Sequence, residues 1–471
     1  MLPPMARFTP DPSFYASPGD AVRAPRETLA YVAILNTGTN GDRAPDAIGV
    51  LDLEEGSATY GQLVGRVDMP GVGDELHHFG WNACSSALCP WAPHPHVERR
   101  HLLVPGLRSS RIHVLDVKDD PRAPKLVKVV EAEEIARKAG YSRPHTIHCG
   151  PDGIYVSALG DPAGDGPGGI FLLDHEDYAV KGAWEADRGT QELAYDFWWH
   201  LNQGTVITSE WGTPKMVEDG LIGELLLGNR YGHRLHVWDL QSRRHVQEVD
   251  LGAEHQMVLE LRPAHDPRKA YGFVGVVTST ADLSASVWLW QKADDGTVAA
   301  EKVISIPAEP AQAEQLPPIL QPFGAVPPLV TDIALSVDDR WLYVSCWGTG
   351  ELKRFDVSDP RAPKETGSVR LGGIAGRAPH PAAGPLNGGP QMVEVSRDGR
   401  RVVLTNSLYA SWDAQFYPEG IDGWLVTLAA GEDGSLTLDP DVFVEFSGER
   451  PHQVRLEGGD ASSDSYCFPD R

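Results

Sequence analysis

The sequence predicts an all-β protein, a seven-bladed β-propeller, from its composition and from two families of repeated segments. The chain has 471 residues, of which 49 are glycine and 38 are proline. This content favours short strands joined by tight turns. The length alone would allow two to four domains, but single all-β domains often exceed the usual domain size. The repeats therefore decide the architecture.

The first family consists of seven short segments rich in alternating or β-branched residues, most of them ending near an acidic residue and a turn. They are IGVLDL (48–53), IHVLDV (112–117), IFLLDH (170–175), LHVWDL (235–240), SVWLWQ (286–291), LKRFDV (352–357) and WLVTLA (424–429). Each pattern predicts a half-buried strand.

The second family precedes the first along the chain. Residues 144–157, 330–345 and 390–405 superpose when Asp152, Asp338 and Asp398 of their hairpin turns are aligned. Looser members bring this family to seven as well; they are residues 76–84, 194–209, 256–263 and 451–456. Seven copies of a multi-strand unit of roughly 60 residues are typical of a seven-bladed propeller. A pair of β-sandwiches is the alternative, but it does not explain the sevenfold repeat.

The ends of the chain complete one blade between them. Residues 451–456 have no outer strands after them, and residues 31–38 have no inner strand before them. We therefore predict that the N- and C-terminal strands pair, which closes the ring and removes its exposed edges. Residues 25–471 form one propeller domain in this interpretation, and residues 1–24 form an irregular extension. Residues 131–140 predict a single short helix.

Charge and terminal composition exclude several classes of partner. Lys and Arg number 41 against 66 Asp and Glu, a net charge of −25, which disfavours nucleic acid and anionic membranes. The N-terminus lacks a basic segment followed by an apolar run, and no stretch is long enough to span a membrane. We expect a cytoplasmic protein without a transmembrane segment, with the periplasm as the alternative. The oligomeric state stays open.

Histidines at equivalent repeat positions predict a metal site. In a propeller the innermost strands begin at the mouth of a central channel, and the alignment puts His145 and His452 at one such position. The segment around His77 and His78 adds one or both of these residues. His148 lies three residues beyond His145, where an ideal strand would turn it to the opposite face, but a bulge or the entry into a turn could bring it to the same one. Imidazole clusters without carboxylate chelates suit copper, zinc, iron or nickel.

Carboxylates and one cysteine are the other candidates. Asp74, Glu75, Glu210 and Asp332 lie near the histidines in the alignment, where they could orient imidazoles or accept protons. It is equally consistent with the sequence that these four carboxylates only solvate the ends of strands.

The five cysteines are Cys84, Cys89, Cys149, Cys346 and Cys467. They are too few and too scattered for a disulfide framework. Cys84 is either a reactive thiolate or a small buried residue. Cys149 and Cys346 are expected to be buried and inert. The single C-x4-C pair of Cys84 and Cys89 is weak support for zinc.

Several long motifs resemble the selenium-binding protein / methanethiol oxidase family from about residue 25 to the C-terminus. They include DELHHFGWNACSS (74–86), RPHTIHC (143–149), ITSEWG (207–212), VTDIALSVDDRWLYVSCWGTGELKRFDVSDPRAPK (330–364) and EGGDASSD (457–464). The resemblance implies a seven-bladed propeller. It also implies copper-dependent oxidation of methanethiol by O2 and water to formaldehyde, hydrogen sulfide and hydrogen peroxide.

By motif matching, the resemblance assigns the copper ligands to His77, His78, His145, His148 and His452, and the family's selenium-linked cysteine to Cys84. The chain departs from the family pattern at Cys89, which is displaced from the usual CSSC motif, and after His452, where the family's acidic residue is Gln453.

Three functions therefore compete. The first is a methanethiol oxidase that takes a small thiol and O2, with Asp74, Glu75, Glu210 or Asp332 as the acid or base. The second is a non-catalytic selenium or thiol carrier centred on Cys84. The third is a propeller that serves only as an interaction scaffold.

Overall fold

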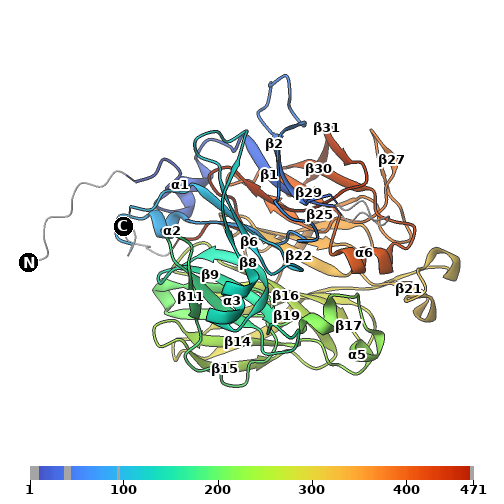
Figure 1. Ribbon diagram of the computed structural model, residues 1–471. Coiled ribbons are helices and arrows are strands. Elements are labelled where there is room, and N and C mark those ends of the chain that lie inside the picture. The colour runs from blue at the N-terminus through green and yellow to red at the C-terminus, as the bar shows by residue number, and fades with distance from the viewer. Residues whose placement is uncertain (1–9, 37–43, 93–95, 467–471) are drawn as a thin grey trace, which may run out of the picture.

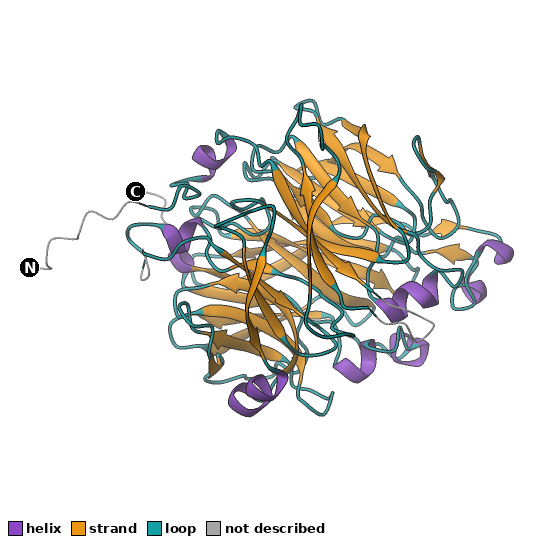
Figure 2. Ribbon diagram, turned by 45° about the horizontal axis from the view of Figure 1, so that its top comes forward, coloured by secondary structure: helices purple, strands orange, loops and turns teal. Residues whose placement is uncertain are grey.

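The computed structural model describes residues 10–36, 44–92 and 96–466, and within these ranges the propeller prediction is confirmed. Seven four-stranded antiparallel sheets surround a central axis (Figures 1 and 2). In six blades the first strand lies innermost and each later strand lies further out, whereas in the seventh blade the last strand of the chain takes the innermost place.

Two strands of each blade lie toward the axis. The innermost strands are β32 (Arg450–Leu456), β4 (Gly80–Trp81), β8 (Ser142–Cys149), β12 (Phe197–His200), β16 (His255–Pro263), β22 (Val330–Leu335) and β28 (Val393–Val395). The second strands are β1 (Leu29–Leu35), β5 (His101–Pro105), β9 (Ile154–Gly160), β13 (Thr205–Thr208), β17 (Tyr271–Ser279), β23 (Trp341–Cys346) and β29 (Arg401–Thr405).

The outer half of each blade contains the first repeat family and the edge strand. The third strands are β2 (Ala47–Asp52), β6 (Ile112–Asp116), β10 (Gly169–Leu173), β14 (Arg234–Asp239), β18 (Ala285–Lys292), β24 (Glu351–Asp356) and β30 (Gly423–Ala430). The edge strands are β3 (Leu63–Asp68), β7 (Lys125–Val130), β11 (Val180–Ala183), β15 (Arg244–Asp250), β19 (Val298–Ile306), β25 (Lys364–Arg370) and β31 (Leu436–Phe446).

The chain ends close the ring as predicted. Strand β32 pairs antiparallel with β1, and the register runs from Ala30 opposite Leu456 to Leu35 opposite Arg450. The C-terminal strand is therefore the innermost strand of the blade that the N-terminal strands complete.

Burial explains why the strands differ in composition. Second strands such as β1 and β9 are buried along their whole length, whereas the edge strand β15 alternates exposed and half-buried residues. Seven of the apolar clusters each lie between two neighbouring blades, for example the cluster of Tyr31 and Trp81. A strand packed on both faces needs apolar residues throughout, and an edge strand needs only every second one.

Two opposite ends of the propeller carry different additions. Figure 1 shows α1 (Pro18–Val22), α2 (Ser85–Leu88) and both termini at one end, and α5 (Gly223–Leu227), α6 (Ala410–Phe416) and β21 (Ala325–Val326) at the other. An eighth apolar cluster packs α4 (Pro214–Val217), α5 and α6 together with long loops. We call this cluster the aromatic cap, because Tyr195, Trp211, Trp347, Tyr409 and Trp412 belong to it.

The remaining elements are short. The predicted helix at 131–140 is α3 (Ala132–Ala139), and two small hairpins are β20 (Glu309–Pro310) with β21 and β26 (Pro379–His380) with β27 (Gly384–Pro385). Three 3-10 turns span Leu201–Gln203, Ala313–Gln315 and Gln321–Phe323. None of the helices among the described residues is long and apolar enough to cross a membrane.

The N-terminal extension differs in part from the expectation of irregular structure. Within its described portion, residues 10–24, Ser17 caps the short helix α1, and Pro18 fits its first turn. The extension also packs on the propeller, because Lys118 Nζ donates to Asp11 at 2.8 Å. Residues 1–9 lie outside the described part of the chain.

Candidate metal centre

Four histidines from three blades meet at the axis beneath the aromatic cap. His77 precedes β4, His145 lies in β8, and His452 lies in β32. The ring centroids of His77 and His452 are 4.0 Å apart, and those of His78 and His145 are 4.1 Å apart. Ligand nitrogens of His77, His78 and His452 all lie within 4.8 Å of one another. We call these four residues the imidazole centre.

Irregular backbone lets adjacent histidines face the same way. Successive residues of a strand point to opposite faces, but only Leu76 forms a bridge here, to Gly106, and β4 does not begin until Gly80. The rings of His77 and His78 stack at 4.9 Å with an angle of 9° between them. In β8 the register shifts between Pro144 and Ile147, so His145 sits in a bulge, a device that re-aims side chains.

Each histidine keeps one ring nitrogen free of hydrogen bonds with the described residues. These buried nitrogens are His77 Nδ1, His78 Nε2, His145 Nε2 and His452 Nε2. On three rings the other nitrogen is engaged. His452 Nδ1 donates to the Ser407 carbonyl at 2.7 Å, His145 Nδ1 lies 3.1 Å from Thr146 Oγ1, and His78 Nδ1 lies 3.4 Å from Glu260 Oε1. Metal-binding histidines are oriented in this way, because the partner fixes the tautomer and leaves a lone pair for the ion.

Burial keeps these imidazoles neutral. It lowers the pKa values of His77, His78 and His145 well below the usual value, and the neighbouring imidazoles lower them further. The pKa of His452 falls to about 4 through burial, although its bond to the Ser407 carbonyl opposes the shift. A neutral imidazole is the form that binds a metal, so the centre is prepared to accept an ion without first releasing protons.

A buried acid beside the imidazole centre was missed by the sequence analysis. Glu260, in β16, faces His78 and also accepts a hydrogen bond from the Tyr195 hydroxyl at 2.9 Å. Its second oxygen lies 3.0 Å from Arg262 Nη1. Burial raises its pKa well above the usual value, Arg262 opposes this shift, and Asp196 and Asp332 reinforce it. The segment 256–263 was identified as an inner strand, but no histidine there drew attention to Glu260.

The aromatic cap covers the imidazole centre, and a cleft reaches its rim. Tyr195 packs on His145 at 4.1 Å, and Trp211 packs edge-on against Tyr195. A cleft of about 510 Å³ is lined by Glu75, Arg108 and Arg450 among others. Glu75 Oε1 accepts from Arg450 at 3.0 Å and from the Ala410 backbone at 2.8 Å. Because Glu75 and Arg450 lie two positions before His77 and His452, the cleft opens close to the centre.

The other three predicted carboxylates have their nearest partners elsewhere. Asp74 pairs with His113 at 3.4 Å, and Glu210 accepts from His236 Nε2 at 2.9 Å within its own blade. Asp332 accepts hydrogen bonds from Arg262 at 3.0 Å and from the Val393 backbone at 2.8 Å. Arg262 also pairs with Glu260, so this arginine links the two carboxylates. The hydrogen bonds and ion pairs described for these three carboxylates are with groups outside the imidazole centre.

His148 lies apart from the four histidines, in a group with two cysteines. Three residues of strand extend about 10 Å, which carries His148 from His145 toward the end of the propeller that bears α2. There a ring nitrogen of His148 and the sulfurs of Cys84 and Cys149 all lie within 4.8 Å of one another. We call these three residues the thiol group. Cys149, expected to be inert, is buried, but its sulfur lies 3.1 Å from the backbone nitrogen of Cys84.

Comparisons with known proteins agree over the whole chain. A model of the family described as 56kDa selenium binding protein (SBP56) matches residues 8–467. Methanethiol oxidase from Xenopus laevis is 40% identical over 477 residues, which cover 96% of this chain and 97% of the relative. Human methanethiol oxidase is 39% identical over 479 residues with the same coverage.

One solved structure agrees with the fold in detail. The X-ray structure of a hypothetical selenium-binding protein from Sulfolobus tokodaii is 57% identical, has a TM-score of 0.94, and covers 98% of this chain and 100% of its own. Because the match extends over both the motifs and the whole propeller, the chain belongs to the 56kDa selenium binding protein family.

Proposed function

We propose that the protein is a copper-dependent methanethiol oxidase and that the imidazole centre is its active site. Methanethiol, O2 and water would give formaldehyde, hydrogen sulfide and hydrogen peroxide, a reaction balanced in atoms. Relatives about 40% identical over nearly the whole chain are named methanethiol oxidase. The observation that carries the proposal is the set of four buried imidazoles, each with one nitrogen that has no hydrogen-bond partner in the described part of the chain.

The donor set fits copper. Imidazole nitrogens suit copper among other transition metals, and His77, His78, His145 and His452 would hold the ion. When bound, copper would supply the one-electron chemistry that lets a thiol react with O2. Copper also has affinity for thiolate sulfur, which matches the proposed substrate.

Residues of the protein would bind the thiol and accept or donate its protons. Glu260 Oε1 lies 3.4 Å from His78 Nδ1, and Tyr195 and Arg262 hold its two oxygens. We assign to Glu260 the orientation of His78 and the holding of a proton near the substrate, in place of Asp74, Glu210 and Asp332. The aromatic cap packs over the imidazole centre and would exclude bulk water from it.

The test is thiol-dependent O2 uptake by purified, copper-loaded protein, with formaldehyde, sulfide and peroxide measured in the same sample. We expect wild type and His380→Ala to be active, because His380 is a buried histidine on the outer hairpin β26–β27. His145→Ala combined with His452→Ala should abolish turnover. Full activity in this double variant would contradict the site assignment.

A carrier function is the second candidate, because the matching family is described as selenium binding and a mouse relative, 39% identical, is named selenium-binding protein 2. Cys84 would be the attachment point. Its side chain is almost fully buried, which does not favour rapid exchange with a partner. A carrier would incorporate one equivalent of label at Cys84 and release no peroxide.

A further inference from the structure

The thiol group has the composition of a second metal site. Cys84 ends the segment that follows β4 and precedes α2, whereas His148 and Cys149 end β8. All three side chains are at least nine-tenths buried. Two sulfurs and one imidazole nitrogen mutually within 4.8 Å form a compact, mainly soft donor set.

Contacts around the thiol group hold its members in place. Cys84 Sγ lies 3.1 Å from Ser465 Oγ, and the Cys149 carbonyl accepts both from Trp199 Nε1 at 2.6 Å and from His148 Nδ1 at 2.7 Å. His148 packs edge-on against Trp198 at 4.5 Å. The His148 nitrogen that lies 3.7 Å from Cys149 Sγ is also Nδ1. His148 Nε2 is buried and has no hydrogen-bond partner among the described residues, an expensive state unless a ligand completes it.

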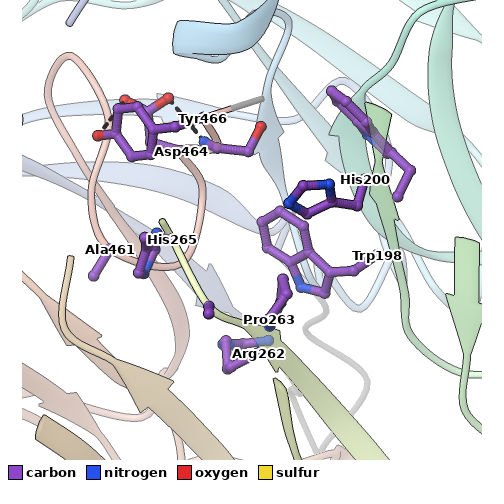
Figure 3. Close-up of a pocket in the computed structure, with 11 residues that line it drawn as sticks. Trp198, His200, Arg262, Pro263, His265, Ala461, Asp464 and Tyr466 are labelled. Atoms are coloured by element: carbon purple, nitrogen blue, oxygen red, sulfur yellow. Dashed lines mark hydrogen bonds between the residues drawn. The ribbon is translucent and has the colours of Figure 1, made fainter. Parts of the chain in front are cut away.

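A small pocket lies on the outer side of these contacts. It has a volume of about 20 Å³, and Trp198, Trp199, Asp464 and Ser465 contribute to its lining. Figure 3 shows Trp198 and His200 on one side of it and Asp464 and Tyr466 on the other. A space of this size admits about one water molecule. Three residues that line this pocket contact the thiol group, because Trp198 and Trp199 pack edge-on against His148 and Ser465 Oγ lies 3.1 Å from Cys84 Sγ.

We propose that Cys84, Cys149 and His148 bind one monovalent copper ion, at a site separate from the imidazole centre. Thiolates select soft ions, and a three-donor set suits monovalent copper, whereas structural zinc sites almost always have four ligands. Binding displaces the two thiol protons to solvent and changes no oxidation state. The buried guanidinium of Arg99, 3.2 Å from Asp464, provides positive charge on the same side.

The test counts copper on the full chain. Protein stripped with a chelator is titrated anaerobically with monovalent copper against a chromophoric competitor. We expect two equivalents for wild type and one for Cys84→Ala combined with Cys149→Ala. Cys346→Ala, which removes a buried cysteine from β23, should still bind two. A copper count that is the same in wild type and in the double cysteine variant would overturn the proposal.

X-ray absorption at the copper edge tests the ligands without depending on the cysteine variants. His145→Ala combined with His452→Ala should retain one copper with sulfur neighbours, and the fully loaded wild type should show both sulfur and imidazole. No sulfur signal in either sample, or displacement of this copper by an equivalent of Zn²⁺, would overturn the assignment. Sulfur-bound copper in a protein that does not oxidise methanethiol would refute the proposed function and leave this inference standing.

Discussion

The imidazole centre and the thiol group lie toward opposite ends of the propeller and differ in the softness of their ligand atoms. One offers imidazole nitrogens, and the other offers mainly thiol sulfurs. The imidazole centre gathers four neutral rings from three blades under the aromatic cap. The thiol group gathers two sulfurs and one ring from two blades near the chain termini. Strand β8 contributes to both, through His145 at one end and His148 with Cys149 at the other.

This difference shows how one inner strand can serve two kinds of chemistry. In the imidazole centre, three of the rings are oriented by a carbonyl, a hydroxyl and a carboxylate. Their other nitrogens keep lone pairs for a metal ion of intermediate softness. At the other end, the sulfur of Cys84 lies against Ser465 and the ring of His148 against Trp198, and two sulfur donors favour a softer ion. Variants that disturb one end and spare the other therefore test the comparison directly.

The largest effect is expected from His452→Ala. Loss of one imidazole ligand should lower the thiol oxidation rate by at least about 100-fold, more than the loss of an outer partner usually costs. Val454→Ala, on the same strand, removes buried packing without removing a donor. Copper content and O2 uptake should be reduced only in the first variant. Equal losses in both would show that strand packing, and not ligation, limits activity.

Glu260→Gln should have the next largest effect. The substitution keeps the shape of the side chain but weakens its hold on His78 and on the Tyr195 hydroxyl, so copper affinity at the imidazole centre should fall by about 10- to 100-fold. The pH profile of turnover should shift at the same time.

Glu210→Gln is the matched control for Glu260→Gln, since Glu210 is equally buried but serves His236. We expect copper affinity at the imidazole centre to stay at the wild-type value in this variant. A similar fall in both would assign Glu260 a general structural role.

Glu75→Gln should change stability more than chemistry. Its carboxylate pairs with Arg450, which keeps Asp413 as a second partner. The free energy of unfolding should therefore fall by only about 1–2 kcal/mol, measured as a shift of the urea midpoint. Glu432→Gln removes an exposed pair with Arg400 and should give no measurable shift. A shift above 4 kcal/mol for Glu75→Gln would indicate that Arg450 is left uncompensated.

Acid should have the smallest effect on the imidazole centre. The pKa of His452 lies at about 4, below the ordinary 6.5, so protons compete with copper only near and below pH 4. Copper retention after dialysis should change by less than about twofold between pH 7.5 and pH 5.5. A release midpoint near 6.5 would mean that the rings are solvated and titrate normally.

Sequence reasoning recovered the propeller because repeats report on packing that is the same in every blade. All seven segments of the first family are third strands, and all members of the second family are or include innermost strands. The convergence of His77, His145 and His452 follows from those equivalent positions.

Side-chain direction was harder to predict. The position of His148 depends on how far β8 carries it from His145. The surroundings of Cys149 depend on the segment of Cys84, which is 65 positions away in the sequence. Glu260 became recognisable only through its contacts, because a glutamate in an inner strand has no distinctive pattern of its own. Asp74 and Glu210 show the converse, since both lie near the histidines in the repeat alignment yet pair with His113 and His236, outside the centre.

The closed ring has a consequence for protein synthesis. Thr28 and Glu457 are 429 positions apart, yet Thr28 Oγ1 donates to Glu457 at 3.2 Å beside the pairing of β1 with β32. During translation the early blades can form in order as they emerge, but the blade of β1 stays without its innermost strand until residues 450–456 have been made. The imidazole centre is therefore complete only after β32 has paired with β1, because His452 lies in β32.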